Sequence, residues 1–243
     1  MSDMLEKYRG EIGDKTADVI YRLVKRARLP RNNKVYNAGA IDIDTSQAAG
    51  YKGPKKVSML DFFLIRDESP DAEIGRFLFY DQQSVTESRM LPDCVVARKK
   101  GEEVIENIRI PVREEIMRFY MGFLDKICQQ GDDPSTYGNT VHADADVIYH
   151  VNDRVMSGKV IAESKLSEGR YANRIREHLY DDNKLAEILR DEKREQKVVA
   201  EARRIAQACS FNPDHAEEFV KWMMNITLRT VEVEYLRKKL SKE

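Results

Sequence analysis

The sequence has few glycines and prolines, 12 and 7 among 243 residues. Together they fall below the usual share of about 12%, whereas β-sandwiches and Gly-rich phosphate-binding folds need many turn residues. This scarcity favours helices. The three cysteines, Cys94, Cys128 and Cys209, lie far apart. We therefore expect neither a disulfide framework nor a thiolate metal site, and a reducing cytoplasm as the setting.

Long apolar runs and a net charge are also missing. No stretch approaches the roughly 18 apolar residues of a membrane span, and we expect no secretory signal. The 41 Lys and Arg residues balance 42 Asp and Glu residues, for a net charge of −1. This balance, without a basic and aromatic-rich face, argues against a nucleic acid or an acidic membrane as partner. The composition is typical of a soluble globular protein, and the length allows one large domain or two small ones.

The apolar residues recur at three- and four-residue steps, which predicts an all-α chain. Residues 31–57 and 131–139 are interpreted as loops and 70–100 as irregular. The segment VEVEYL alternates with period two, but a lone strand would have nothing to pair with, so it is assigned to a helix. We expect helices over residues 5–27, from 58 to before 70, 111–131, 141–166, 167–178, 183–208 and 212–240.

Several charged residues lie on the apolar stripes instead of opposite them. Each could be an edge residue that extends to solvent, and the run RDEKREQK could be a solvated face. A buried unpaired ion costs several kcal/mol, however, so these charges need partners. They could form a structural salt network, or they could hold a dianion with arginine forks. The charges on the stripes are Arg9, Arg154, Lys165, Asp191 or Glu192, Glu195 and Glu232, and Gly158 would leave space for a ligand between Arg154 and Lys165.

At these residues the sequence resembles the eukaryotic-type, all-helical chorismate mutases of fungi and plants. The strongest blocks are GDDPSTYGN (131–139), RVMSGKVIAESKL (154–166) and VEVEYLRKKL (231–240), and the similarity covers nearly the whole chain. YRGEI, RARLPRNNKVY (26–36) and RDESPD (66–71) support them. D-x-x-R-E at 191–195 also resembles the motif of the smaller bacterial mutases. The resemblance implies one all-helical domain over residues 1–243, a cytoplasmic homodimer, and an isomerase in phenylalanine and tyrosine biosynthesis.

The resemblance also implies roles for the charged residues. Arg9 and Arg154 would hold the two carboxylates of chorismate, and Lys165 would bind its ether oxygen and a carboxylate. Glu195 would take the ring hydroxyl, and Glu232 would face the ether oxygen. Asp191 stands where the fungal family tends to have Asn and the bacterial one Asp. The reaction has one substrate and needs no metal or cofactor. The alternative is a mutase-like helical protein that has lost catalysis and serves as a binding or regulatory module.

The sequence departs from the fungal pattern at several positions. Leu228 replaces a Thr near the substrate carboxylate, so a polar contact there is missing or comes from Thr227. The helix after residue 58 is about two turns shorter, and the loop before residue 213 lacks an insertion. Arg66, Gly138 and Asn139 match parts of the family's effector site, but Ile65 replaces an Arg and Asn212 replaces a Thr. These departures argue against feedback inhibition by tyrosine and activation by tryptophan.

Overall fold

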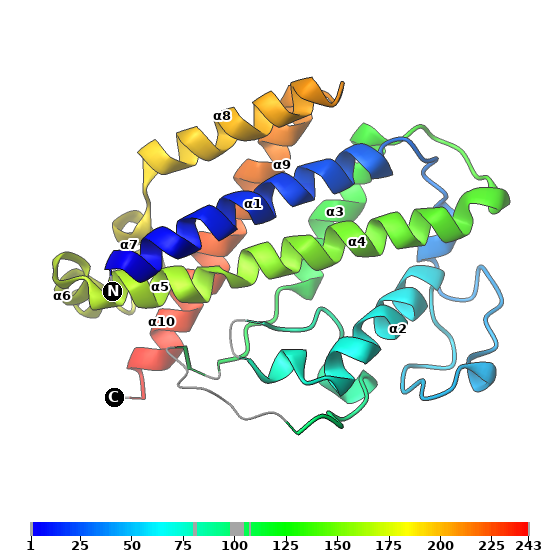
Figure 1. Ribbon diagram of the computed structural model, residues 1–243, viewed down its shortest axis with the longest axis horizontal. Helices are drawn as coiled ribbons and strands as arrows, with labels where there is room; N and C mark the ends of the chain where they lie inside the picture. The colour runs from blue at the N-terminus through cyan, green and yellow to red at the C-terminus, as the bar shows by residue number, and fades with distance from the viewer. Residues whose placement is uncertain (1, 80–81, 98–104, 107, 243) are drawn as a thin grey trace. The chain divides into compact units, whose positions relative to one another are not determined.

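The computed structural model describes residues 2–79, 82–97, 105–106 and 108–242, and side chains from residue 10 onward. Within these residues the structure contains α-helices, short 3-10 turns and one π-helical segment, but no strand (Figure 1). No helix in this part of the chain is long and apolar enough to cross a membrane. The chain divides into two compact units, so the predicted single domain stays a prediction.

Unit 1 comprises Met1–Tyr21, Glu102–Val112 and Asp153–Glu243. It contains most of α1 (Ser2–Arg26) and the helices α5 (Gly158–Ser167), α6 (Gly169–Glu177), α7 (Asp182–Leu189), α8 (Glu192–Ala208), α9 (Pro213–Ile226) and α10 (Val233–Leu240). Helices α8 and α9 pack side by side as a hairpin (Figure 1). Asn212 caps α9 by accepting a hydrogen bond from the Asp214 N–H.

Unit 2 comprises Arg22–Gly101 and Arg113–Asn152. Its helices are α2 (Met59–Glu73), α3 (Arg113–Ile127) and most of α4 (Tyr137–Met156), and its 3-10 turns are Asn33–Tyr36, Thr45–Gln47, Arg76–Leu78, Ser88–Met90 and Pro134–Thr136. Its core holds the ion pair of Arg26 and Asp144, both fully buried. The hydroxyls of Tyr36 and Tyr120 each donate to Asp144 at 2.7 Å, which satisfies the buried carboxylate.

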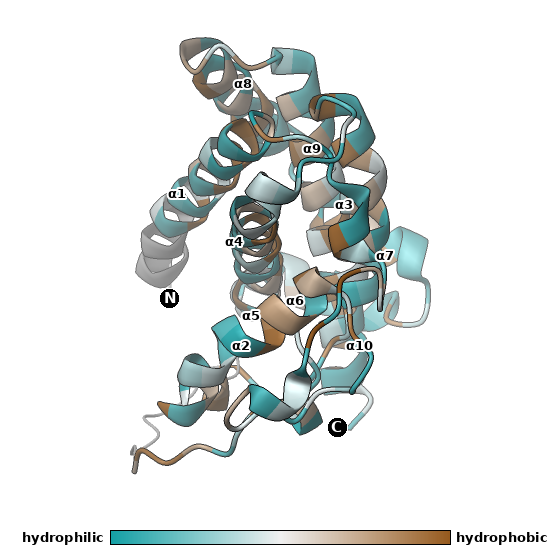
Figure 2. Ribbon diagram, turned by 90° about the vertical axis from the view of Figure 1, so that its right-hand side faces the viewer, coloured by the Kyte–Doolittle hydropathy of each residue, from teal (hydrophilic) through white to brown (hydrophobic). Residues whose placement is uncertain are grey.

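The helices carry hydrophobic and hydrophilic residues along the same length, and none of the labelled helices is brown throughout (Figure 2). This is the pattern that the three- and four-residue apolar steps predict. In unit 1 the residues of the inward faces are fully buried, among them Phe219, Met223 and Leu236. Each helix is therefore packed through its apolar face. An ionic side chain on that face is unusual, because it is buried among apolar groups.

Several predicted helix boundaries are wrong. The helix predicted over 141–166 begins earlier, at Tyr137, and is two helices, α4 and α5, interrupted at Ser157. The one predicted over 183–208 is also two, because Asp191 accepts a hydrogen bond from the Arg194 N–H and caps a new helix. The helix after Ser58 does not end before Pro70 but continues to Glu73. Pro70 has no N–H to donate, but its carbonyl accepts the Ile74 N–H at 3.0 Å, so helical hydrogen bonding continues past it.

The last helix contains a π-helical segment, Thr227–Glu232, between α9 and α10. Such segments hold an extra residue in the turn and often occur at functional sites. Gly158 of α5 lies directly against it: a Cβ there would be 3.0 Å from Val231 Cγ1 and 3.1 Å from Thr227 Cγ2. Gly158 therefore permits a close approach of two helices. The prediction that it leaves space for a ligand is wrong, because helix packing fills that space.

Candidate active site

Most of the charged residues on the apolar stripes meet at one cavity of unit 1. The cavity has a volume of about 110 Å³. It is lined from α1, the end of α4, α5, α6, the α7–α8 junction, α8, α9 and the π-helical segment. Its lining includes Ile12, Arg154, Lys165, Asp191, Arg194, Glu195, Thr227, Leu228 and Glu232. Four of the five principal residues predicted from the sequence thus surround the same space.

Arg9 is the fifth, and its side chain lies outside the part of the chain that the structure describes. Its backbone belongs to α1. This helix reaches the cavity through Ile12, three residues later and within one helical turn. The predicted contribution of Arg9 to the site stays a prediction.

Arg154 is buried in the cavity wall and has an unused hydrogen-bond donor. It is only 4% exposed, so it does not extend to solvent. Its Nε donates to Thr16 Oγ1 at 2.9 Å, while its Nη1 is buried without a partner in the described part of the chain. Burial and, to a smaller extent, the positive charge of Arg194 lower the pKa of this guanidinium to about 10, against the opposing effect of Glu232. It remains charged at neutral pH, and its free N–H suits an anionic ligand.

Lys165 and Glu232 form a direct pair at the same cavity. The Lys165 Nζ donates to Glu232 Oε2 at 2.8 Å and to the main-chain oxygen of Leu189 at 2.6 Å. The Leu189 carbonyl is available because α7 ends there, so the break between α7 and α8 helps to position the lysine. Sequence reasoning misses this contact, since nothing in the side-chain pattern marks a helix end inside a charged run.

Glu232 is almost fully buried, and burial raises the pKa of its carboxyl. Lys165 and Arg154 lower this pKa, and Glu195 raises it, but the effect of burial is larger. A buried carboxyl with a raised pKa takes up a proton more readily and can then donate a hydrogen bond. A cation and a proton donor side by side can stabilise negative charge that develops on an oxygen atom placed between them.

The start of α8 supplies the remaining polar groups of the cavity. Asp191 lines it, whereas Glu192, the alternative considered from the sequence, does not. The Asp191 carboxylate is engaged in capping α8 through the Arg194 N–H, at 3.1 Å. Glu195 is about one-third exposed and lies 3.3 Å from the Arg190 Nε. Its carboxylate is therefore accessible from the cavity and is only partly neutralised.

Thr227 and Leu228 both line the cavity and are buried. The Thr227 hydroxyl donates to the Met223 carbonyl at 2.7 Å, which leaves its oxygen free to accept only. Sequence reasoning misses Thr16, the partner of Arg154. A signal for it exists, because Thr16 is a polar residue on the apolar stripe midway between Ile12 and Ile20.

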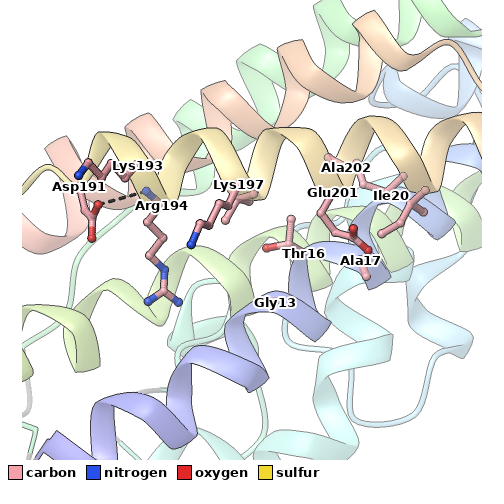
Figure 3. A pocket seen from close by; sticks show the side chains of 12 residues that line it. Gly13, Thr16, Ala17, Ile20, Asp191, Lys193, Arg194, Lys197, Glu201 and Ala202 are labelled. Carbon is pink, nitrogen blue, oxygen red and sulfur yellow. Dashed lines mark hydrogen bonds between the residues drawn. The ribbon is translucent and has the colours of Figure 1, made fainter.

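A second hollow of about 540 Å³ adjoins the cavity along α1 and α8 (Figure 3). The two share Asp191, Arg194 and Val198 in their linings. In Figure 3 the side chains of Arg194 and Lys197 extend from α8 on the side where Thr16 and Gly13 of α1 lie. Ile20, Ala202 and Ile205 add an apolar surface, and Lys193 adds a further cation. The hollow is therefore a groove beside the cavity, lined by three cations and by the carboxylates of Asp191 and Glu201.

The predicted effector residues lie in unit 2. Arg66 belongs to α2, and Gly138 and Asn139 belong to the first turn of α4, where the sequence predicts a loop. All three are exposed. The Arg66 guanidinium donates to the main-chain oxygen of Ala49, within the long segment 31–57. This contact gives Arg66 a structural partner that requires no ligand.

Comparison with curated proteins finds chorismate mutases of fungi and plants. The chorismate mutase of Schizosaccharomyces pombe is 27% identical over 165 residues, which cover 66% of this chain and 61% of that protein. Chorismate mutase 2, cytosolic, of Zea mays is 26% identical over 250 residues, which cover 91% of this chain and 90% of the relative. The chain thus spans about three fifths of the first relative and nearly all of the second. No family model matches the chain.

A solved structure extends the comparison to the fold. The structure of Aro7p chorismate mutase from Candida albicans in complex with L-Trp matches with a TM-score of 0.86 at 19% identity. The match covers 98% of this chain and 92% of that chain. The all-α fold class predicted from the sequence is confirmed.

Proposed function

We propose, from the premise that this chain is a homologue of the fungal and plant chorismate mutases, that it converts chorismate to prephenate. In this rearrangement the ether C–O bond breaks while a C–C bond forms within the same molecule. No atom enters or leaves, so no nucleophile, metal or cofactor takes part. The protein has to hold the diaxial, chair-like conformer and stabilise the charge that builds on the ether oxygen.

Arg154 and Arg9 are proposed to hold the two substrate carboxylates. The buried Nη1 of Arg154, which has no partner among the described residues, is the observation that carries this proposal, because a dianionic ligand supplies the acceptor that those residues do not. Glu195 takes the ring hydroxyl, since its carboxylate lies at the cavity and is partly free. Asp191 has a capping role in addition to any contact with the substrate.

Lys165 and Glu232 are proposed to act on the ether oxygen. Both are at the cavity and bond each other directly at 2.8 Å, so an ether oxygen that replaces this bond by moving between them receives one hydrogen bond from each. A donor of this kind, positioned before the reaction, contributes roughly 3 kcal/mol to lowering a barrier. Glu232 has to be protonated to donate, and its buried position favours that form. Leu228 gives this part of the wall an apolar surface, and Thr227 offers a single acceptor.

The test follows the loss of chorismate absorbance with purified protein under mildly acidic conditions. We expect turnover in the wild-type protein and none above background in Arg154→Ala. Absence of turnover in the wild-type protein refutes the proposal. If prephenate or chorismate then still binds, the inactive binding or regulatory protein is the correct interpretation.

We also propose that the protein is a cytoplasmic homodimer whose rate does not respond to aromatic amino acids. The cytosolic assignment of the maize relative supports the location, and family analogy supports the dimer. The Candida enzyme is described in complex with L-Trp. Here Ile65 and Asn212 replace effector-site residues of the family pattern. Sedimentation tests the dimer, and a rate that changes on addition of tyrosine or tryptophan contradicts the lack of regulation.

A further inference from the structure

A second buried cluster of charges lies between α5 and α10 of unit 1, outside the cavity. Glu163 of α5 is 6% exposed in its side chain and accepts hydrogen bonds from the Tyr235 hydroxyl and the Lys239 Nζ of α10. The Tyr235 hydroxyl also accepts the Glu106 N–H at 3.0 Å. Tyr235 is completely buried, and burial raises the pKa of its hydroxyl, so it stays protonated and keeps donating. Glu163, Tyr235 and Lys239 are called the outer clamp below.

The outer clamp joins the same two stretches of chain as the pair in the cavity. Glu163 lies two residues before Lys165 on α5, and Tyr235 lies three residues after Glu232, about one helical turn further along. Helix α5 packs against both the π-helical segment and α10. Helix α5 and the end of the last helix are therefore connected by two sets of polar contacts. The pair of Lys165 and Glu232 lies at the cavity, and the outer clamp lies outside it.

A ligand affects the Lys165–Glu232 pair and the outer clamp differently. Lys165 and Glu232 are 2.8 Å apart, which is a direct hydrogen bond and leaves no space for an oxygen atom between them. An ether oxygen inserted between the two side chains breaks this bond. The hydrogen bond between Lys165 and Glu232 is then absent while the substrate is bound, when the distance between the two side chains matters for the reaction. The outer clamp lines no part of the cavity, so a ligand there leaves it intact.

We propose that the outer clamp is a positioning device that keeps Lys165 and Glu232 at their working separation while the substrate lies between them. This proposal rests on the proposed function. Glu163, Tyr235 and Lys239 touch no substrate, and they act by fixing α10 against α5. Their loss is therefore expected to slow the chemical step more than it weakens substrate binding, because Arg154 and Glu195 come from other elements.

The test compares Tyr235→Phe and Lys239→Met with the matched control Lys238→Met. Lys238 is the neighbouring lysine of α10, and its carboxylate partner is Glu234 of the same helix instead of α5. Values of kcat and KM are measured well below the unfolding temperature of each variant. We expect a roughly tenfold lower kcat with KM changed less than twofold in the two clamp variants, and wild-type values in the control.

A second readout separates positioning from a loss of stability. The groups that face Glu232 are Lys165, Arg154 and Glu195. A loosened α10 lets water reach Glu232, so the midpoint of its titration, followed by carboxyl 13C NMR in ligand-free protein, is expected to fall in the clamp variants. Lys239→Arg keeps the cation and is expected to restore kcat and the midpoint.

The outcomes decide between the two proposals. Folded clamp variants with the kcat and titration midpoint of the wild-type protein overturn the positioning role. If Tyr235→Phe does not fold, Lys239→Met, which alters the less buried end, decides alone. Absence of turnover in the wild-type protein refutes the proposed function instead, and the NMR midpoint still tests whether the outer clamp fixes Glu232.

Discussion

Replacement of Arg154 by Leu is expected to stabilise the protein while it destroys activity. The fold lowers the pKa of this guanidinium from its ordinary value to about 10. That difference corresponds to about 3 kcal/mol by which the ligand-free fold disfavours the charged form. The variant relieves this cost and loses the hydrogen bond to Thr16, worth about 1 kcal/mol. A net gain of about 2 kcal/mol should raise Tm by roughly 4–8 °C.

The same substitution removes the proposed partner of a substrate carboxylate. A carboxylate left unpaired at a buried site costs about 3–5 kcal/mol, so kcat/KM should fall by a factor on the order of 10² to 10⁴. The measurements are thermal unfolding by circular dichroism and initial rates of chorismate loss. Arg204→Leu is the control, because Arg204 is exposed and its ion pair is with Glu201, one turn away on α8, so it should change neither quantity.

The alternative of a purely structural salt network predicts the opposite sign. A network that needs Arg154 would lose stability with the substitution and would have no substrate-dependent function to lose. A lower Tm together with retained activity in Arg154→Leu would therefore refute the assignment of this residue to substrate binding. A higher Tm with lost activity separates the two interpretations in favour of a ligand site.

Three further predictions concern other charged groups. Activity should be complete below the raised pKa of Glu232 and decline as pH rises through it, because the protonated form is the active one, and Glu232→Gln should flatten the profile. An unchanged profile contradicts this role. In unit 2, Asp144→Ala should lower the free energy of unfolding by about 3–5 kcal/mol in urea, because a buried guanidinium loses its partner. The control Asp146→Ala removes a carboxylate that is 35% exposed and pairs with Arg22, so it should cost less than about 1 kcal/mol, and equal losses in the two variants contradict the reasoning. Lys193→Gln combined with Lys197→Gln should raise KM for a dianion about two- to fivefold at low ionic strength, with kcat unchanged. A difference that persists in 0.5 M salt argues against a long-range electrostatic effect.

The sequence is sufficient to predict helices but not where they break. The apolar steps predict the first helix over 5–27, and the structure has it at Ser2–Arg26. The break at Asp191 is missed because the run around it consists of good helix formers. Whether Asp191 caps a new helix or continues the old one depends on a local hydrogen bond of its side chain, which the run of residue types does not reveal. The π-helical segment Thr227–Glu232 gives no signal in the periodicity. It depends on packing against Gly158, and such a contact exists only in three dimensions.

The sequence predicts those residues of the candidate site that are charged and lie on the otherwise apolar face of a helix. Arg154, Lys165, Glu195 and Glu232 do so and converge at one cavity. Arg194 does not stand out, since it is one cation in a run of charges. Its position at the cavity depends on where α8 begins. The Leu189 carbonyl and the outer clamp are missed for a related reason, because main-chain acceptors and contacts between two helices leave no periodic trace in a single sequence.

The π-helical segment makes this part of the chain sensitive to insertions and deletions. In a regular α-helix each residue adds a rotation of about 100°. Removal of one residue from Thr227–Val231 could restore regular helical hydrogen bonding, and the helix itself would lose little stability. Every residue that follows would nevertheless rotate to another face, so Glu232 and Tyr235 would both leave α5. The helix would remain, and the site would be dismantled by a change in register alone.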